Sequence, residues 1–282
     1  MAEKAVVFAY HDVGVRCLRV LLDAGVDVPL VVTHRDSPAE AIWFASVADL
    51  ARSRRIDTLA DPEAAETFSR VQSIKPDFIF SFYYRRMLPA ALLKLAKRGA
   101  FNMHGSLLPK YRGRAPVNWA VLHGETETGA TLHEMVEKPD AGRIVGQERV
   151  PIGPDDLAVD VFRKVTAAAE SVLKKNLNKI IEGKADRREQ NLAAGSYFGG
   201  RRPEDGRIDW SRSAAEIHNL VRAVAPPYPG AFTDRMKISK TKLEPQRRPP
   251  AGVKGPYQEN REWFAVCGDG KVLRLVEVEQ TK

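Results

Sequence analysis

The chain has few cysteines and no long apolar segment. Only Cys17 and Cys267 occur among its 282 residues, one near each end, and two thiols cannot supply a disulfide framework or a four-cysteine zinc site. The longest apolar runs, such as residues 5–10 and 28–32, are far shorter than the roughly 20 residues needed to cross a bilayer, and no secretory signal pattern is present. We therefore expect buried, unreactive thiols, no membrane insertion and a cytoplasmic protein.

Two motifs of cofactor-binding proteins are also missing. The six histidines include no pair at helical spacing of the HExxH kind, so no metal is expected. The first apolar run ends in Tyr10-His11-Asp12-Val13-Gly14, without the GxGxxG that binds a dinucleotide. The sequence thus predicts a protein without a metal and without NAD.

The charge balance is basic. With 44 Lys and Arg against 36 Asp and Glu, the net charge of +8 favours anionic partners such as nucleic acids, nucleotide sugars or polyglutamylated folates. Much of the excess lies in a C-terminal basic cluster formed by Arg235, Lys237, Lys240, Lys242, Arg247 and Arg248. The cluster fits a lysine-guarded sheet edge and an RNA-binding face equally well, and its sequence does not separate the two.

Apolar runs alternate with helical periodicity over the first two thirds of the chain. Strands are expected over residues 5–10, 28–33, 77–82, 99–103, 128–136 and 144–150. Helices are expected over residues 13–24, 39–52, 64–74 and 116–123 and from the Asp155-Asp156 cap to about residue 182. This alternation predicts a Rossmann-like α/β domain with a parallel sheet, whose ligands bind beyond the carboxyl ends of the strands.

The pattern changes near residue 190. A polar, glycine-containing linker over residues 191–204 precedes a predicted helix over 214–224. Short strands without intervening helices follow, over residues 231–239, 252–257, 262–267 and 271–278, and they predict a small OB-like β-barrel. We therefore expect a catalytic domain over 1–190 and a C-terminal domain over 205–282.

The densest group of reactive side chains follows the strand expected over 99–103. Alternate residues of a strand face the same way, so Asn102 and His104 should point together into a cleft. An amide beside an imidazole suits acyl transfer, because one stabilises an oxyanion while the other moves protons. The same spacing occurs around structural histidines, so spacing alone leaves both readings open. His123 and His133 are expected to be packing or surface residues.

Several segments together resemble one family. The sequence resembles the 10-formyltetrahydrofolate-dependent formyltransferases in four segments: Asn102-Met-His-Gly-Ser-Leu-Leu-Pro109, residues 111–116, residues 127–129 and Asp140-Ala-Gly142. The likeness extends over almost the whole chain. Within the family, it is closest to the subgroup that formylates UDP-4-amino-4-deoxy-L-arabinose in lipid A modification and polymyxin resistance, through residues 6–11, 80–85, 198–203, which hold one additional glycine, and 222–225.

The resemblance implies roles for particular residues. Asn102, His104 and Asp140 would form a catalytic triad, in which the carboxylate favours the protonated imidazole. Without the resemblance, the position of Asp140 before Ala-Gly predicts a turn residue. The folate, as formyl donor, would lie against Arg86, Met87, Leu88 and Arg114 and the loop Val136, Glu137, Lys138, Pro139 and Asp140. The acceptor would be the 4-amino group of the sugar nucleotide, which Tyr10 and His11 could approach.

Two other functions remain open. Methionyl-tRNA formyltransferases share the Asn-x-His core and a barrel-like second domain, and the C-terminal basic cluster favours this reading. However, residues 33–60 hold no long basic, glycine-rich insertion of the kind that family uses to bind tRNA. The alternative of another class is an RNA-binding module on an inactive formyltransferase scaffold, which the intact Asn102, His104 and Asp140 disfavour. We expect no nucleic-acid partner, and a homo-oligomer is compatible with the sequence.

Overall fold

The computed structural model describes residues 3–38 and 40–280, and its internal contacts divide the chain into two units. The first comprises Met1–Gly113, Gly129–Val150 and Lys164–Tyr197, and the second comprises Arg114–Thr128, Pro151–Arg163 and Phe198–Lys282. Cys17 and Cys267 are free and buried, as expected. Among the described residues, no helix is long and apolar enough to span a membrane.

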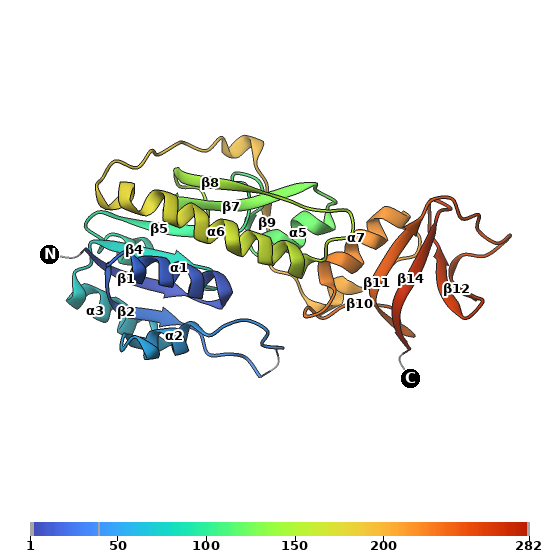
Figure 1. The fold of residues 1–282 in the computed structure, drawn as a ribbon, viewed down its shortest axis with the longest axis horizontal. Helices are drawn as coiled ribbons and strands as arrows, with labels where there is room; N and C mark the ends of the chain where they lie inside the picture. The colour runs from blue at the N-terminus through green and yellow to red at the C-terminus, as the bar shows by residue number, and fades with distance from the viewer. Residues whose placement is uncertain (1–2, 39, 281–282) are drawn as a thin grey trace. The chain divides into compact units, whose positions relative to one another are not determined.

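A seven-stranded sheet forms the centre of the first unit (Figure 1), with the order β3-β2-β1-β4-β5-β7-β8. Its strands are β1 (Lys4–Ala9), β2 (Asp27–Thr33), β3 (Asp57–Ala60), β4 (Phe78–Phe82), β5 (Gly99–His104), β7 (Glu127–Glu134) and β8 (Ile144–Pro151). The strands from β3 to β5 pair in parallel, whereas β7 runs antiparallel to β5. The predicted α/β domain is confirmed, but its sheet is mixed rather than wholly parallel.

Helices cover both faces of this sheet. They are α1 (His11–Asp23), α2 (Val47–Ser53), α3 (Ala64–Ile74), α4 (Ala90–Leu93) and α6 (Ala158–Ile181). Arg16 of α1 pairs with Glu170 of α6 at 3.2 Å, and the two helices lie on the same face in Figure 1. Alternate β1 residues on the other face, among them Phe8, pack with Val71 of α3 and Leu92 of α4.

The predicted helix over residues 39–52 is wrong in its first half. α2 begins at Val47, where the Ser46 hydroxyl accepts the Asp49 N–H at 3.2 Å. Before it, the Phe44 ring stacks on His11 with 3.7 Å between centroids, and Trp43 meets the same ring edge-on at 4.7 Å. These contacts hold the segment in an irregular path and override its helical periodicity. Residue 39 lies outside the described residues.

The second unit contains α5 (Pro116–Leu122), α7 (Ala214–Val224) and a five-stranded antiparallel sheet. The sheet has the order β10-β11-β14-β13-β12, with strands β10 (Ala231–Phe232), β11 (Met236–Glu244), β12 (Gly255–Glu259), β13 (Glu262–Val266) and β14 (Val272–Gln280). The predicted antiparallel C-terminal domain is confirmed, although the strand expected over 231–239 divides into β10 and β11. Two further short strands, β6 (Arg112–Gly113) and β9 (Tyr197–Phe198), pair with each other.

Candidate active site at the end of strand β5

The pairing of β5 with β7 brings polar side chains together on one face of the sheet. Asn102 lies directly opposite His133, and His104 lies opposite Thr131. Residues opposite each other on antiparallel strands share a face, as do alternate residues of one strand. The expected juxtaposition of Asn102 and His104 therefore occurs, and the antiparallel strand adds His133 to it.

The Asp140 carboxylate lies at the centre of this group. Its Oδ1 is 3.5 Å from Asn102 Nδ2, 3.6 Å from His104 Nδ1 and 3.5 Å from His133 Nε2. Its Oδ2 accepts the backbone N–H of Gly113 at 2.8 Å. The structure thus brings together the three residues that were predicted to be catalytic and places His133 beside them.

The loop around Asp140 is held in an uncommon backbone conformation. Asp140 has a φ of +51°, in the left-handed region that few residues other than glycine adopt. The Gln190 side-chain amide donates to the carbonyls of Asp140 at 2.9 Å and Gly142 at 2.6 Å. A Cβ at position 142 would lie 2.0 Å from the Glu134 carbonyl oxygen, so only glycine fits there. These constraints fix the direction of the Asp140 carboxylate.

The surroundings of Asp140 keep it ionised. Burial alone would raise the pKa of this carboxyl, but His104 and His133, in their protonated forms, and the Gly113 N–H outweigh burial and hold the pKa well below its ordinary value. Asp140 is therefore a carboxylate at neutral pH. A fixed negative charge between two imidazoles can stabilise a positive charge that forms on either ring.

The hydrogen bonds of His104 define the position of its ring proton. Nε2 lies 2.8 Å from the Tyr111 carbonyl oxygen, which can only accept, so Nε2 carries a hydrogen. Nδ1 faces Asp140 Oδ1 at 3.6 Å, beyond ordinary hydrogen-bond length. Nδ1 is therefore the ring nitrogen that can exchange a proton, next to a carboxylate that stabilises the resulting cation.

His133 orients the Asn102 amide. The Glu134 carbonyl oxygen, 2.7 Å from His133 Nδ1, can only accept, so Nδ1 carries the hydrogen of the neutral ring. Nε2 can then accept one N–H of Asn102, whose Nδ2 lies 3.1 Å away. The amide has two N–H groups, and this arrangement leaves the second for another acceptor. The sequence alone assigned His133 no role.

Hydrogen bonds within the Gly-Ser-Leu-Leu-Pro turn and from neighbouring strands hold its backbone in place. The buried Ser106 hydroxyl donates to the Lys110 carbonyl at 2.7 Å, and Thr131 Oγ1 donates to the Ser106 carbonyl at 2.6 Å. Gln147 donates to the Leu108 carbonyl at 3.0 Å. These bonds account for Ser106 as a structural residue and position the chain that leads to Tyr111.

The predicted folate-binding residues of the first unit lie on two loops, one after β4 and one after β7. Arg86 pairs with Asp61 at 3.1 Å. The side chains of Met87 and Val136 are 63% and 45% exposed, respectively, and belong to the few large apolar residues that the fold leaves in solvent. Leu88 packs partly against the core. Glu137 and Lys138 are exposed, and Pro139 and Asp140 are half-buried.

Arg114 belongs to the second unit. Its backbone N–H donates to the Phe198 carbonyl at 3.0 Å. In the same unit, Trp119 stacks on Phe198 with 4.9 Å between ring centroids, and the Arg201 guanidinium lies 4.8 Å from the Trp119 ring centre. These contacts bring Arg114 and Arg201 close to the same aromatic residues.

A network of hydrogen bonds fixes the loop after β4. The Arg85 N–H donates to His34 Nε2 at 3.1 Å, so the neutral His34 ring carries its hydrogen on Nδ1 and donates it to Asp61, 2.7 Å away. The ring stacks on Tyr84 at 4.3 Å. Because Asp61 also holds Arg86, His34 and Asp61 together anchor the loop that carries the predicted folate contacts.

Tyr10 and His11 are engaged by the protein itself. The Tyr10 hydroxyl donates to Asp36 at 2.8 Å, and the Arg85 guanidinium lies 4.7 Å from its ring centre. Burial, with Arg85 nearby, lowers the pKa of His11 to about 3. His11 is therefore neutral at physiological pH. The structure places both residues under the segment that follows β2, where Phe44 covers the His11 ring.

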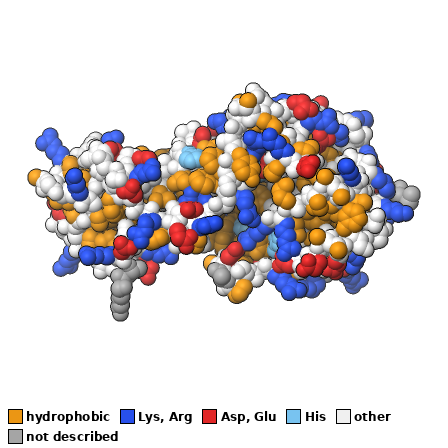
Figure 2. All heavy atoms as spheres, turned by 180° about the vertical axis from the view of Figure 1, so that it is seen from behind, with side chains coloured by type: hydrophobic (Ala, Val, Ile, Leu, Met, Phe, Trp, Pro, Cys, Tyr) orange, Lys and Arg blue, Asp and Glu red, His pale blue; other side chains and the backbone are white. Residues whose placement is uncertain are grey.

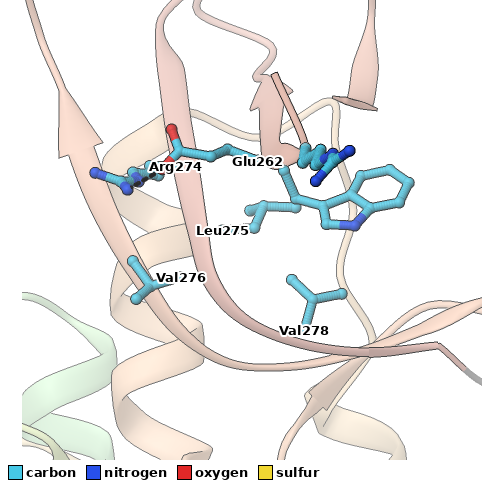
Figure 3. A pocket seen from close by; sticks show the side chains of 7 residues that line it. Glu262, Arg274, Leu275, Val276 and Val278 are labelled. Atoms are coloured by element: carbon cyan, nitrogen blue, oxygen red, sulfur yellow. Dashed lines mark hydrogen bonds and ion pairs between the residues drawn. The ribbon is translucent and has the colours of Figure 1, made fainter. Parts of the chain in front are cut away.

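A cavity of about 220 Å³ lies on the antiparallel sheet of the second unit. In Figure 3, Leu275 and Val278 point into it, and Arg274 and Glu262 form an ion pair at its rim. Its lining contains no histidine and no unpaired carboxylate. The groups that acyl transfer requires are therefore absent from this cavity.

The C-terminal basic cluster is partly neutralised by its neighbours. On β11, Lys237 lies opposite Glu279 and Lys240 lies opposite Glu277 of β14, an arrangement that favours cross-strand attraction. Figure 2 likewise shows basic and acidic side chains interspersed on the face it displays. The cluster has the organisation expected of a charged sheet surface.

The mainly parallel sheet, the polar group at the end of β5 and the antiparallel second unit together define a two-part α/β transferase fold. Residues 17–177 match the family model described as formyl transferase, and residues 201–282 match that of the formyl transferase C-terminal domain. The first match alone covers more than half of the chain. The chain therefore belongs to the formyl transferase family.

Solved structures with the same fold include sugar-modifying enzymes. An N-formyltransferase from Helicobacter canadensis, in complex with folinic acid and dTDP-3-aminofucose, is 23% identical, with a TM-score of 0.78 over 100% of both chains. WlaRD, a sugar 3N-formyl transferase studied with dTDP and 5-N-formyl-THF, is 22% identical, with a TM-score of 0.79 over 100% of this chain and 99% of that one. A sugar N-formyltransferase from Shewanella is 17% identical, with a TM-score of 0.65 over 82% and 92% of the two chains.

Proposed function

We propose that the protein transfers the formyl group of 10-formyltetrahydrofolate to the 4-amino group of a sugar nucleotide, UDP-4-amino-4-deoxy-L-arabinose, as a step of lipid A modification that confers polymyxin resistance. The observation that carries the proposal is the convergence of Asn102, His104 and His133 on the Asp140 carboxylate, each within 3.6 Å of Oδ1. This group can bind an oxyanion and move one proton, which is what amide formation from a formyl donor needs.

The reaction can be written with these residues in named roles. The neutral amine attacks the formyl carbon, a C–N bond forms, and the carbonyl oxygen becomes an oxyanion. The second N–H of Asn102 donates to that oxygen, while His133 holds the first. His104 Nδ1 accepts the proton from the amine, supported by Asp140, and returns it to N10 of the folate as the bond from N10 to the formyl carbon breaks.

The exposed apolar side chains support a folate site on the loops after β4 and β7. Met87 and Val136 remain 63% and 45% exposed, and a flat heterocycle would cover such surface favourably. Both loops follow strands next to or near β5, which carries the catalytic asparagine. The enzymes from Helicobacter canadensis and WlaRD were studied with folinic acid and 5-N-formyl-THF, which agrees with a folate donor.

Two observations support a nucleotide-linked amine as acceptor. Arg201, whose guanidinium lies over the Trp119 ring, and Arg114, whose backbone bonds to Phe198, supply the cation and ring combination that suits a nucleoside diphosphate. The structurally similar enzymes are described with dTDP or a dTDP-linked amino sugar.

We also propose boundaries for the two domains. The catalytic domain comprises residues 1–190 and the C-terminal domain residues 205–282, and residues 191–204 join them.

Formylation of initiator tRNA is the competing reaction. It would need a sequence-independent basic surface for the phosphate backbone, whereas Lys237 and Lys240 of the C-terminal basic cluster face glutamates across the strand pair. That pairing favours the smaller acceptor, and the intact Asp140 group disfavours an inactive RNA-binding scaffold.

A competition among acceptors tests the proposal. The protein is incubated with 10-formyltetrahydrofolate and, in separate reactions, UDP-4-amino-4-deoxy-L-arabinose, a dTDP-linked amino-hexose or methionyl initiator tRNA, and each product is examined by mass spectrometry. We expect formylation of the UDP-sugar. Formylation of the dTDP-sugar alone would mean that the acceptor is a different sugar nucleotide from the one proposed. Formylation of the tRNA alone would refute the proposed function.

A further inference from the structure

One buried cation next to the active site has no side-chain partner among the residues that the structure describes. Arg112, in β6, is 9% exposed, and its Nε has no hydrogen-bond acceptor. Within residues 3–38 and 40–280, no carboxylate forms an ion pair with its guanidinium and no carbonyl accepts from it. A guanidinium keeps its proton in a protein, so Arg112 carries a charge for which no described carboxylate is a partner, and its Nε is both buried and without an acceptor.

A second buried arginine shows how this fold treats a structural guanidinium. Arg222 is 5% exposed and its Nε also lacks an acceptor, but its two terminal nitrogens donate to the Gly153 carbonyl at 3.1 Å, the Asp156 carbonyl at 3.0 Å and the Asn219 side chain at 2.6 Å. Arg112 forms none of these bonds. Because burying an unpaired charge destabilises a fold, Arg112 is not explained by stability.

The backbone places Arg112 between the two residues that hold the catalytic side chains. The Tyr111 carbonyl binds His104 at 2.8 Å, and the Gly113 N–H binds Asp140 at 2.8 Å. Gly113 adopts a φ of +97°, which glycine tolerates, but Tyr111 adopts +56°, in the left-handed region that disfavours residues with side chains. Unfavourable backbone conformations of this kind persist where a site needs them.

We propose that Arg112 binds an oxyanion of a substrate through its guanidinium fork. Planar guanidinium groups pair with phosphate or carboxylate oxygens through two parallel N–H bonds. The reaction under Proposed function, on which this assignment of ligands rests, offers two sources of that chemistry: the diphosphate of the acceptor nucleotide and the glutamate carboxylates of the folate. The bound oxyanion would provide the negative charge that no described carboxylate of the protein provides.

Binding and unfolding measurements on three variants test the proposal. Arg112→Met removes the cation with little change in volume, Arg112→Lys keeps the charge but not the fork, and Arg222→Met is the matched structural control. Calorimetric affinities are measured for UDP, dTDP, 5-formyltetrahydrofolate and its pteroate analogue without glutamate. Urea unfolding gives the stability of each variant.

We expect Arg112→Met to lower the affinity for one ligand by about ten- to hundredfold, because a charged hydrogen-bonded contact is lost. Arg112→Lys should restore part of that affinity. Weaker UDP or dTDP binding identifies the diphosphate as the ligand. Weaker folate binding, present only with the glutamate, identifies the carboxylate. Arg112→Met should unfold no more easily than the wild type, whereas Arg222→Met should be destabilised.

Unchanged affinity for all four ligands would overturn the proposal, whether or not stability changes. A loss of stability in Arg112→Met that matches Arg222→Met, with unchanged affinities, would show that Arg112 is structural. Failure of the proposed function is a separate result, because it would appear as wild-type protein that binds folate but formylates no sugar nucleotide. The folate measurements would still decide the role of Arg112 in that case.

Discussion

His133 stands directly opposite Asn102 on two antiparallel strands, with its Nε2 3.1 Å from the Asn102 amide nitrogen. The neighbouring Glu134 carbonyl fixes the His133 tautomer, so the ring presents an acceptor to the amide. The orientation of the Asn102 amide is thus set by a residue that touches no reacting atom in the proposed mechanism.

Replacing His133 should therefore reduce turnover through Asn102. We expect His133→Ala to lower kcat by about ten- to hundredfold, since a misplaced catalytic group can cost roughly a hundredfold in rate. The KM for the folate should change little. Steady-state kinetics measure both, and His218→Ala, which changes a buried histidine of the second unit that bonds to Thr241 and the Pro154 carbonyl, is the control. A His133→Ala enzyme with wild-type kcat would show that the amide is oriented without it.

Removal of the Asn102 amide itself should have a larger effect. Loss of one oxyanion donor typically removes about 2.7 to 4 kcal/mol of transition-state stabilisation, so Asn102→Ala should lower kcat by about a hundred- to a thousandfold. Asn102→Asp keeps the shape, loses both N–H donors and adds a charge next to Asp140, so it should be at least as slow. Circular dichroism melting of both variants tests whether folding is intact. Turnover near that of the wild type would exclude the oxyanion role.

The lowered pKa of Asp140 makes a prediction about stability and pH. Its folded-state pKa lies below the ordinary value, despite burial, because of His104, His133 and the Gly113 N–H. Such a carboxylate contributes stability above its unfolded pKa of about 3.9, and this contribution disappears as pH falls through the folded value. The difference in unfolding free energy between wild type and Asp140→Asn should therefore shrink as the pH falls below about 4.

Urea unfolding at each pH measures that difference. Asp186→Asn, a change at an exposed carboxyl, is the matched control and should show no such trend. If the Asp140→Asn difference did not depend on pH, the carboxylate would not be held ionised by its neighbours.

His34 should couple the folate site to pH. Burial lowers the pKa of His34, although Asp61 opposes that effect, so the ring is neutral near pH 7 and accepts the Arg85 N–H. Protonation below the lowered pKa would remove that acceptor and place a cation beside Arg85 and Arg86. The KM for 10-formyltetrahydrofolate should rise only at pH values below the ordinary histidine pKa of about 6.5, with a smaller change in kcat.

The variant His34→Gln separates this effect from other titrations. Its KM should be raised several-fold at pH 8 and should depend less on pH than that of the wild type. Initial rates between pH 5.5 and 8 at saturating acceptor measure the dependence. Identical profiles for the two proteins would remove His34 from the anchoring of the loop after β4.

The local elements of the fold were predictable where their signals are local. The helices predicted over 64–74 and 214–224 match α3 and α7. The structure shows that a Ser213–Glu216 capping box, a local signal of this kind, begins α7. The segment before α2 was not predicted correctly, because Trp43 and Phe44 pack on His11 from a distant part of the chain. Contacts of this kind carry no periodic signature.

The candidate site was predictable only in part for the same reason. Strand alternation pairs Asn102 with His104 from the sequence, and family resemblance adds Asp140. The contact between Asn102 and His133 depends on the direction and register of β7 against β5, which alternation within one strand does not specify. Arg112 stands out only because its burial and missing partners are visible in three dimensions.

Transfer of a labelled formyl group tests the central claim most directly. Protein is mixed with 10-formyltetrahydrofolate carrying ¹³C in the formyl carbon and with UDP-4-amino-4-deoxy-L-arabinose, and the product is followed by NMR. The account predicts a ¹³C formamide on the sugar nitrogen with the wild type and at least about a hundredfold slower formation with Asn102→Ala. Label that remains on the folate with the wild-type protein, or label that appears at equal rates with both proteins, would contradict it.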